Sequence, residues 1–216
     1  KNEPSAYATW CKESYVPGGI FLEEWNKILV SSLSTNKGFE EILLYLAKIK
    51  STTRERIVRD LKLSSGGSTS LILRELDRCG FIERYVPIGQ PESSKLARYT
   101  MADPYLRAYA KLIYPNINKI KKGIYKNNPS AALALNQFRQ SLGYSFEFFC
   151  HSNPALIAEI LGFGGIQYQF GSFYNRHTDK LNPGFQIDLL FKRADRVLTV
   201  CEIKYLSSVV DLKVVK

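Results

Sequence analysis

Two apolar segments near the C-terminus, joined by a charged turn, constrain the fold more than any other feature. The segments FQIDLLF (185–191) and VLTVCEIKY (197–205) are rich in β-branched and aromatic residues, and KRADR (192–196) lies between them. Such segments around a short polar turn predict a β-hairpin. In this hairpin the numbers of facing residues sum to roughly 388–390, so Asp188 is expected across from residues 200–202.

Three charged residues interrupt these predicted strands. Glu202 and Lys204 are two positions apart, so both side chains leave the same face of a strand, and Asp188 leaves the face opposite Ile187 and Leu189. Burying a charge is costly unless it is paired or binds a metal ion. Two interpretations are open: an edge strand with solvated charges, or part of an active site in which two carboxylates and an amine converge.

The active-site interpretation fits metal-assisted hydrolysis of a phosphodiester. Asp188 and Glu202 would hold Mg²⁺ or Mn²⁺ through oxygen, and such an ion polarises a phosphate and lowers the pKa of a bound water. Lys204 would position that water or offset the developing negative charge. Glu147, on a helix predicted within residues 130–153, would add a third carboxylate. The candidate catalytic residues are Asp188, Glu202, Lys204 and Glu147, and the three carboxylates are the candidate metal ligands.

The order of these elements resembles a known superfamily. A helix carrying Glu147, a strand around residues 166–170, and strands carrying Asp188 and the Glu202–Lys204 motif resemble the PD-(D/E)XK nucleases, whose core is an αβββαβ unit. Ile187 replaces the proline of the superfamily motif. The resemblance implies a restriction-endonuclease-like α/β domain over residues 130–216.

An earlier region has the element order of a winged helix-turn-helix. FEEILLYLAKI, STTRERIVRDLKL and SSGGSTSLILRELDRCG predict three short helices, and two strands joined by a loop follow at residues 81–101. Ser51 or Thr52, with Glu55, is the expected cap of the second helix. In this fold the third helix enters the major groove and the hairpin loop lies on the DNA backbone. The candidate DNA-binding residues are Ser68, Ser70, Arg74, Arg78, Arg54 and Lys95. Winged helices also serve as protein-protein modules, so that alternative stays open.

The charge balance favours a polyanionic partner. The 216 residues carry a formal net charge of +10, which suits nucleic acid or an anionic membrane surface. The four cysteines are scattered without metal-ligand spacing, and no apolar run approaches the length of a membrane span. We therefore expect a cytoplasmic protein that binds DNA and not a membrane, and the sequence leaves its oligomeric state open.

The whole chain is also similar to a more specific family. YVPGGIFLEEW, the winged-helix segment, RYTMADPYLRAYAKLIYP, GYSFEFFC and IDLLF…CEIKY follow one another as in the C-terminal part of archaeal and bacterial STAND-like AAA-type ATPases. This implies an α+β chain with the tail of an ATPase-type helical region at 1–35, a winged helix at 36–100, a helical connector at 101–129 and the nuclease-like domain at 130–216. The ATPase domain of the same protein would be a partner, and the chain itself lacks the G-x-x-x-x-G-K-[ST] phosphate loop.

Three functions follow from these expectations. The first is a metal-dependent deoxyribonuclease delivered to DNA by the winged helix. The second is a catalytically silent DNA- or protein-binding module of the ATPase. The third is a winged-helix transcription regulator whose C-terminal region mediates dimerisation or ligand binding, which a preference for palindromic sites would reveal.

Overall fold

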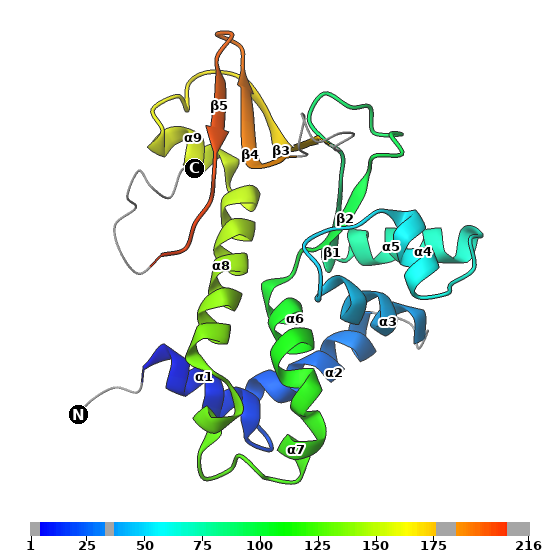
Figure 1. Ribbon diagram of the computed structural model, residues 1–216, viewed down its shortest axis with the longest axis vertical. Helices are drawn as coiled ribbons and strands as arrows, with labels where there is room; N and C mark the ends of the chain where they lie inside the picture. Colours follow the sequence, from blue (N-terminus) through cyan, green and yellow to red (C-terminus); the bar gives the residue numbers. More distant parts are fainter. Residues whose placement is uncertain (1–4, 33–36, 176–184, 207–216) are drawn as a thin grey trace. The chain divides into compact units, whose positions relative to one another are not determined.

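The chain folds into helices and small antiparallel sheets, as expected for an α+β protein. The computed structural model describes residues 5–32, 37–175 and 185–206. Backbone contacts divide the chain into two compact units (Figure 1). Unit 1 comprises Lys1–Arg84 and Arg98–Ser141, and unit 2 comprises Tyr85–Ala97 and Leu142–Lys216.

Unit 1 is mainly helical. Its first half contains α1 (Ala6–Tyr15), α2 (Ile20–Ser32), α3 (Lys37–Leu46), α4 (Arg54–Asp60), α5 (Gly67–Arg78) and β1 (Ile82–Tyr85), which ends at the unit boundary. Its second half contains β2 (Arg98–Met101), α6 (Pro104–Ala108), the π-helix η1 (Tyr109–Ile113), the 3₁₀-helix η2 (Tyr114–Asn116), α7 (Ile117–Lys121) and the 3₁₀-helix η3 (Pro129–Ala132). The long helix α8 (Leu135–Ser152) begins here and continues into unit 2.

The predicted order of three helices and two strands is confirmed in α3–α5, β1 and β2. Apolar residues at helical spacing in α3 and α5 form one core with residues of α4 and β1, because each helix has a single apolar face to bury. Members of this core with less than 2% exposure are Ile42, Leu43, Leu46, Ile57, Leu73, Leu76 and Ile82. Gly80, at φ 73°, provides the left-handed turn between α5 and β1.

The expected cap of α4 was wrong by one or two residues. Thr53 caps the helix, and its side chain accepts a hydrogen bond from the Arg56 N–H at 3.4 Å. Thr52 is instead buried and forms a β-bridge with Tyr99, with N···O distances of 3.0 and 2.8 Å. The backbone of Thr52 therefore pairs with β2 as a third, very short strand. The N-cap of α4 is consequently the next residue, Thr53.

The connector after β2 packs onto the helices that precede α4. Asp103 accepts a hydrogen bond from the Leu106 N–H at 2.8 Å and caps α6, and Pro104 takes the first helical position, where its missing N–H costs nothing. The Tyr109 ring of η1 stacks on Trp25 of α2, with centroids 4.6 Å apart and planes 9° from parallel. Contacts of η1 with both α2 and α3 make the connector part of the same unit as the three-helix region.

In the described part of unit 2, a helix packs on one face of an antiparallel sheet. The elements are the C-terminal part of α8, α9 (Pro154–Ile160), β3 (Tyr168–Asn175), β4 (Phe185–Arg193) and β5 (Leu198–Cys201), with strand order β3–β4–β5. Leu189 and Phe191 of β4 form a core with Ala158 of α9 and Phe163 of the α9–β3 turn. Gly162, at φ 79°, opens that turn. α9 is not among the elements predicted from the sequence.

The loop between β1 and β2 belongs to unit 2. The Ile88 N–H donates to the Ser172 carbonyl of β3 at 3.4 Å, and the Tyr174 hydroxyl donates to the Leu96 carbonyl. β3 is an outer strand of the sheet, so the loop covers part of an edge that would otherwise be open to pairing. Among the described residues, no helix is both long enough and apolar enough to cross a membrane.

Candidate functional site

The register between β4 and β5 determines where the charged residues of the hairpin meet. Leu189 pairs with Cys201, Leu190 with Val200 and Phe191 with Thr199, which confirms the upper end of the predicted range. By continuation, Asp188 falls across from Glu202. The predicted strand over 197–205 is shorter than expected, because β5 ends at Cys201.

The Asp188 side chain accounts for the end of the backbone pairing between β4 and β5 at Cys201. Its carboxylate Oδ2 accepts a hydrogen bond from the Ile203 N–H at 3.1 Å, so the side chain takes a backbone donor that a carbonyl of β4 would otherwise satisfy. Asp188 is only 7% exposed, and a buried carboxylate needs such donors to offset its desolvation. The Ser172 hydroxyl donates to the Asp188 carbonyl at 3.1 Å from the neighbouring strand. Asp188 is thus held from β3 and from the segment after β5.

Glu202 and Lys204 lie next to each other just after β5. The Lys204 ammonium forms an ion pair with the Glu202 carboxylate, and both side chains are about half exposed, at 44% and 49%. An ion pair this exposed contributes little to stability. Its two groups are therefore available to a ligand at small energetic cost.

The sheet separates these polar groups from the hydrophobic core. Leu189 and Phe191 are buried in the core, and Cys201 and Ile203 pack against it. Asp188 and Glu202 alternate with these residues and occupy positions of the opposite face. The face opposite the core thus carries Asp188 and Glu202 together with apolar residues, since Leu190 and Val200 are paired on it.

Glu147 does not join the two carboxylates of the hairpin in a three-ligand group. Within the described ranges, no cluster of three or more His, Cys, Asp or Glu side chains is placed to hold a metal ion. Glu147 is half-buried on α8, one turn before Cys150. Burial chiefly raises the pKa of the Cys150 thiol, and the nearby Cys201 and Glu147 raise it further.

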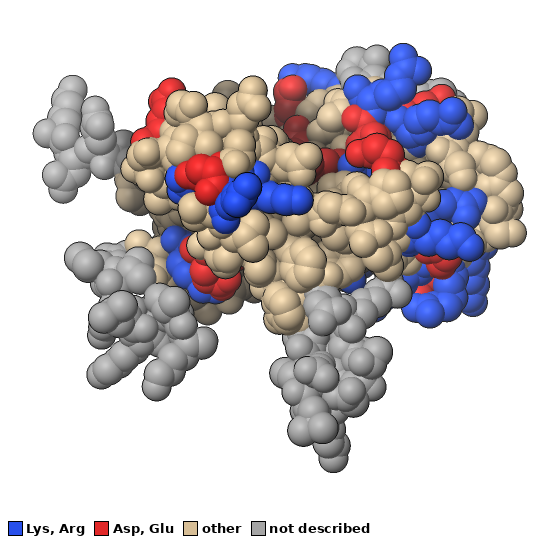
Figure 2. Space-filling model, turned by 90° about the horizontal axis from the view of Figure 1, so that it is seen from above, with Lys and Arg blue, Asp and Glu red and all other residues tan. Residues whose placement is uncertain are grey.

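The candidate DNA-binding residues of α5 have different environments. Ser68, Arg74 and Arg78 are exposed, whereas Ser70 is half-buried. The opposite face of α5 is buried, which orients the helix so that the candidate residues face outward; its buried residues are Thr69, Ile72, Leu73 and Leu76. In Figure 2, basic side chains gather toward the side of the view on which α4 and α5 lie in Figure 1, with acidic side chains among them.

Arg54 contacts the protein itself. Its Nε donates to Ser70 Oγ at 2.9 Å, and its NH2 group donates to the Ser65 and Gly66 carbonyls at 2.6 and 3.2 Å. These three bonds join the start of α4 to the start of α5. The sequence predicts Arg54 as a DNA-binding residue, whereas the structure shows its guanidinium engaged in these bonds within the protein.

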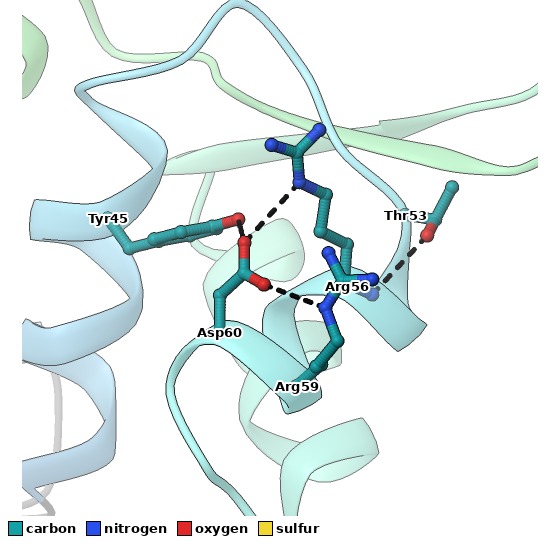
Figure 3. A network of polar contacts seen from close by, with 5 residues as sticks. All are labelled: Tyr45, Thr53, Arg56, Arg59 and Asp60. Atoms are coloured by element: carbon teal, nitrogen blue, oxygen red, sulfur yellow. Dashed lines mark hydrogen bonds and ion pairs between the residues drawn. The ribbon is translucent and has the colours of Figure 1, made fainter.

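The outer arginines of α4 converge on one carboxylate (Figure 3). Asp60 Oδ2 accepts from the Tyr45 hydroxyl at 2.6 Å and lies 3.3 Å from Arg56 Nε, and Arg59 Nε lies 3.0 Å from Oδ1. Tyr45, then Arg59 and Arg56, hold the pKa of Asp60 below its usual value. The basic side chains of α4 are thus partly compensated by charge within their own helix.

Lys95 is exposed in the loop that joins β1 and β2. The adjacent Leu96 carbonyl accepts from the Tyr174 hydroxyl, so the backbone beside Lys95 is attached to β3. The winged-helix expectation placed this loop on a DNA backbone, whereas the structure shows its backbone bound to the sheet of unit 2. The Lys95 side chain nevertheless faces solvent.

Comparison with known proteins finds a partial similarity to an archaeal protein. Over 75 residues the chain is 35% identical to the uncharacterized protein MJECL04 of Methanocaldococcus jannaschii, a stretch covering 35% of this chain and 16% of that protein. The aligned part of the chain therefore spans a small fraction of its relative. No family model matches the chain, and no solved structure matches it significantly.

Proposed function

We propose that the chain binds DNA and hydrolyses its phosphodiester bonds with a divalent metal ion, as a winged helix joined to a PD-(D/E)XK nuclease-like domain. The observation that carries this proposal is the β4–β5 register, which brings Asp188 across from the Glu202–Lys204 segment. Support for the winged helix comes from the order α3–α4–α5–β1–β2 and from the Thr52–Tyr99 bridge, which adds a short strand beside β2. The net charge of +10 suits the same partner.

The donor set fits a hard cation such as Mg²⁺ or Mn²⁺. Asp188 and Glu202 would hold the ion, with water and phosphate oxygens as the remaining ligands, since ions of this class keep several waters. When bound, the ion would polarise the scissile phosphate and activate a water. Asp188 is kept in place by the Ile203 N–H and by the Ser172 bond to its carbonyl. Lys204 would exchange its partner Glu202 for a phosphate oxygen or the attacking water.

A cleavage assay on the full chain tests this proposal. Plasmid and branched DNA are incubated with Mg²⁺ or Mn²⁺ and with wild type, Asp188→Asn or Lys204→Gln. Asp188→Asn keeps an oxygen that accepts the Ile203 N–H but removes the charge, so we expect a folded protein with cleavage reduced at least about 100-fold, as for loss of a group that stabilises transition-state charge. Asp195→Asn, in the β4–β5 turn where Asp195 pairs with Arg193, is the matched control. Wild-type cleavage by Asp188→Asn or Lys204→Gln would contradict the active-site assignment.

A catalytically silent binding module is the second candidate. It is favoured by the position of Glu147, which leaves two carboxylates instead of three at the hairpin within the described residues. Isothermal titration of wild type with Mn²⁺ separates the two functions. DNA binding with no Mn²⁺ uptake and no cleavage would establish the silent module. The ATPase domain of the same protein remains a predicted partner of either form.

A further inference from the structure

A cavity lined by polar, charged and apolar side chains lies beside the helix expected to enter the DNA groove. It has a volume of about 260 Å³ and lies between α5 and the β1–β2 sheet. Its lining residues are Ser70, Leu73, Arg74, Asp77, Arg84 and Tyr99. Residues 70, 74 and 77 follow one stripe of α5, because side chains three or four positions apart are neighbours on a helix. The cavity is thus built from one helix face and one residue from each strand.

The charges of the cavity favour an anion. Arg74 from α5 and Arg84 from β1 supply two guanidinium groups, against the single carboxylate of Asp77. One oxygen of that carboxylate is engaged, since Asp77 Oδ1 accepts from the Arg84 backbone N–H at 2.9 Å and ties β1 to α5. Guanidinium groups present several donors in a fixed plane and pair with phosphate in two-point contacts.

Two other lining residues, Ser70 and Tyr99, are held by partners that lie outside the cavity. Ser70 Oγ accepts a hydrogen bond from Arg54 Nε, so the hydrogen of the Ser70 hydroxyl remains a donor for another oxygen. Tyr99 is fixed by its backbone pairing with Thr52. An anion entering the cavity would meet one donor already oriented by the protein, the Ser70 hydroxyl of α5.

We infer that this cavity is a binding site for a backbone phosphate of DNA, with Arg84 and Arg74 as its ligands. The inference rests on the proposed DNA binding and deepens it. It adds β1 to the elements that the sequence predicts to contact DNA, which are α4, α5 and the β1–β2 loop. The phosphate contact sets the position of α5 on the duplex and carries no sequence information, since base edges alone provide direct readout.

The salt dependence of DNA binding tests this inference. Fluorescence anisotropy with a labelled 20-base-pair duplex gives the affinity at several KCl concentrations for wild type, Arg84→Gln, Arg84→Lys, Arg74→Gln and the double variant with both glutamines. Each phosphate contact contributes about 0.9 to the slope of log K against log salt. Because the two arginines share one phosphate, we expect Arg84→Gln and Arg74→Gln each to remove part of that amount, the double variant to remove all of it, and Arg84→Lys to keep the wild-type slope. Lys12→Gln, which removes an exposed charge from α1, is the control and should leave the slope unchanged.

The outcomes separate this site from the proposed function. If wild type binds no duplex, both the proposed function and the phosphate site are wrong. If wild type binds DNA but Arg84→Gln keeps the wild-type slope, the phosphate site alone is wrong. Inorganic phosphate is titrated in parallel and followed through the arginine side-chain NMR signals. Phosphate binding at Arg84 together with an unchanged DNA slope would identify a free-anion site and overturn the inference.

Discussion

Replacing Arg54 with alanine separates a structural arginine from a DNA-contacting one. The substitution removes three hydrogen bonds, to Ser70, Ser65 and Gly66. The bond to Ser70 is partly buried and is expected to contribute about 1–1.5 kcal/mol, whereas the two exposed bonds to carbonyls contribute a few tenths each. We therefore expect unit 1 to lose about 2 kcal/mol of unfolding free energy. With a typical dependence of unfolding free energy on urea concentration, the midpoint of urea unfolding would fall by about 1 M.

Tryptophan fluorescence reports this change directly, because both tryptophans, Trp10 and Trp25, lie in unit 1. Arg78→Ala is the matched control: Arg78 is also an arginine predicted to contact DNA, and it is exposed near the end of α5. Arg78→Ala should leave the urea midpoint unchanged and lower the salt slope of DNA binding by about 0.9. Arg54→Ala should show the reverse pattern, with a lower midpoint and an unchanged slope. A reduced slope with a wild-type midpoint for Arg54→Ala would refute its structural role.

Two further predictions concern the stability of unit 1. Because hydrogen bonds from Tyr45 and Arg59 lower the pKa of Asp60, the stability it adds is fully present above its unfolded pKa of about 4 and is lost as pH falls through the folded value. As the pH is lowered from 6 to 3, the urea midpoint should therefore fall less for Asp60→Asn than for wild type. An equal fall in both proteins would contradict the stabilising role of the Asp60 contacts with Tyr45 and Arg59. Gly19→Ala would place a Cβ 2.3 Å from the Glu13 carbonyl oxygen and should cost about 1–3 kcal/mol. Gly67→Ala, with no atom within 4 Å of the new Cβ, should be neutral or slightly stabilising, and an equal loss in both variants would show that the Gly19 contact is unimportant.

Local patterns predicted the secondary structure well where an element has one apolar face. The helices α3 to α5 and the strands β1, β2 and β4 lie close to their expected positions, because hydrophobic periodicity reflects which face of each element is buried. β3 extends beyond its expected end at residue 170 to Asn175, and β5 ends at Cys201 instead of residue 205. α9 was missed, although its Ala158 is fully buried in the core of unit 2. Its seven residues are too few to show a helical period, and its packing beneath β4 stabilises it.

The candidate site was predictable to the extent that strand pairing fixes it. Period-two alternation and a short turn were enough to place Asp188 across from residues 200–202, and the observed register selects Glu202 from that range. The environment of Asp188 was not predictable, because Ser172 reaches it from a third strand at an irregularity between Gly171 and Phe173. The position of Glu147 was not predictable either, since a helix period gives the face of a residue but not the direction of the helix axis relative to a sheet.

The sequence by itself determined the order of three helices and two strands in unit 1, the presence of the C-terminal hairpin and the charge balance, since each depends on neighbouring residues or on composition. Only the tertiary structure decided the roles of individual charged groups. Arg54 and Arg84 are both arginines near α5, yet one bridges two helices and the other lines a cavity with Arg74. The difference arises because a long cationic side chain takes whichever acceptors the fold brings within its reach, and those acceptors come from residues distant in the chain.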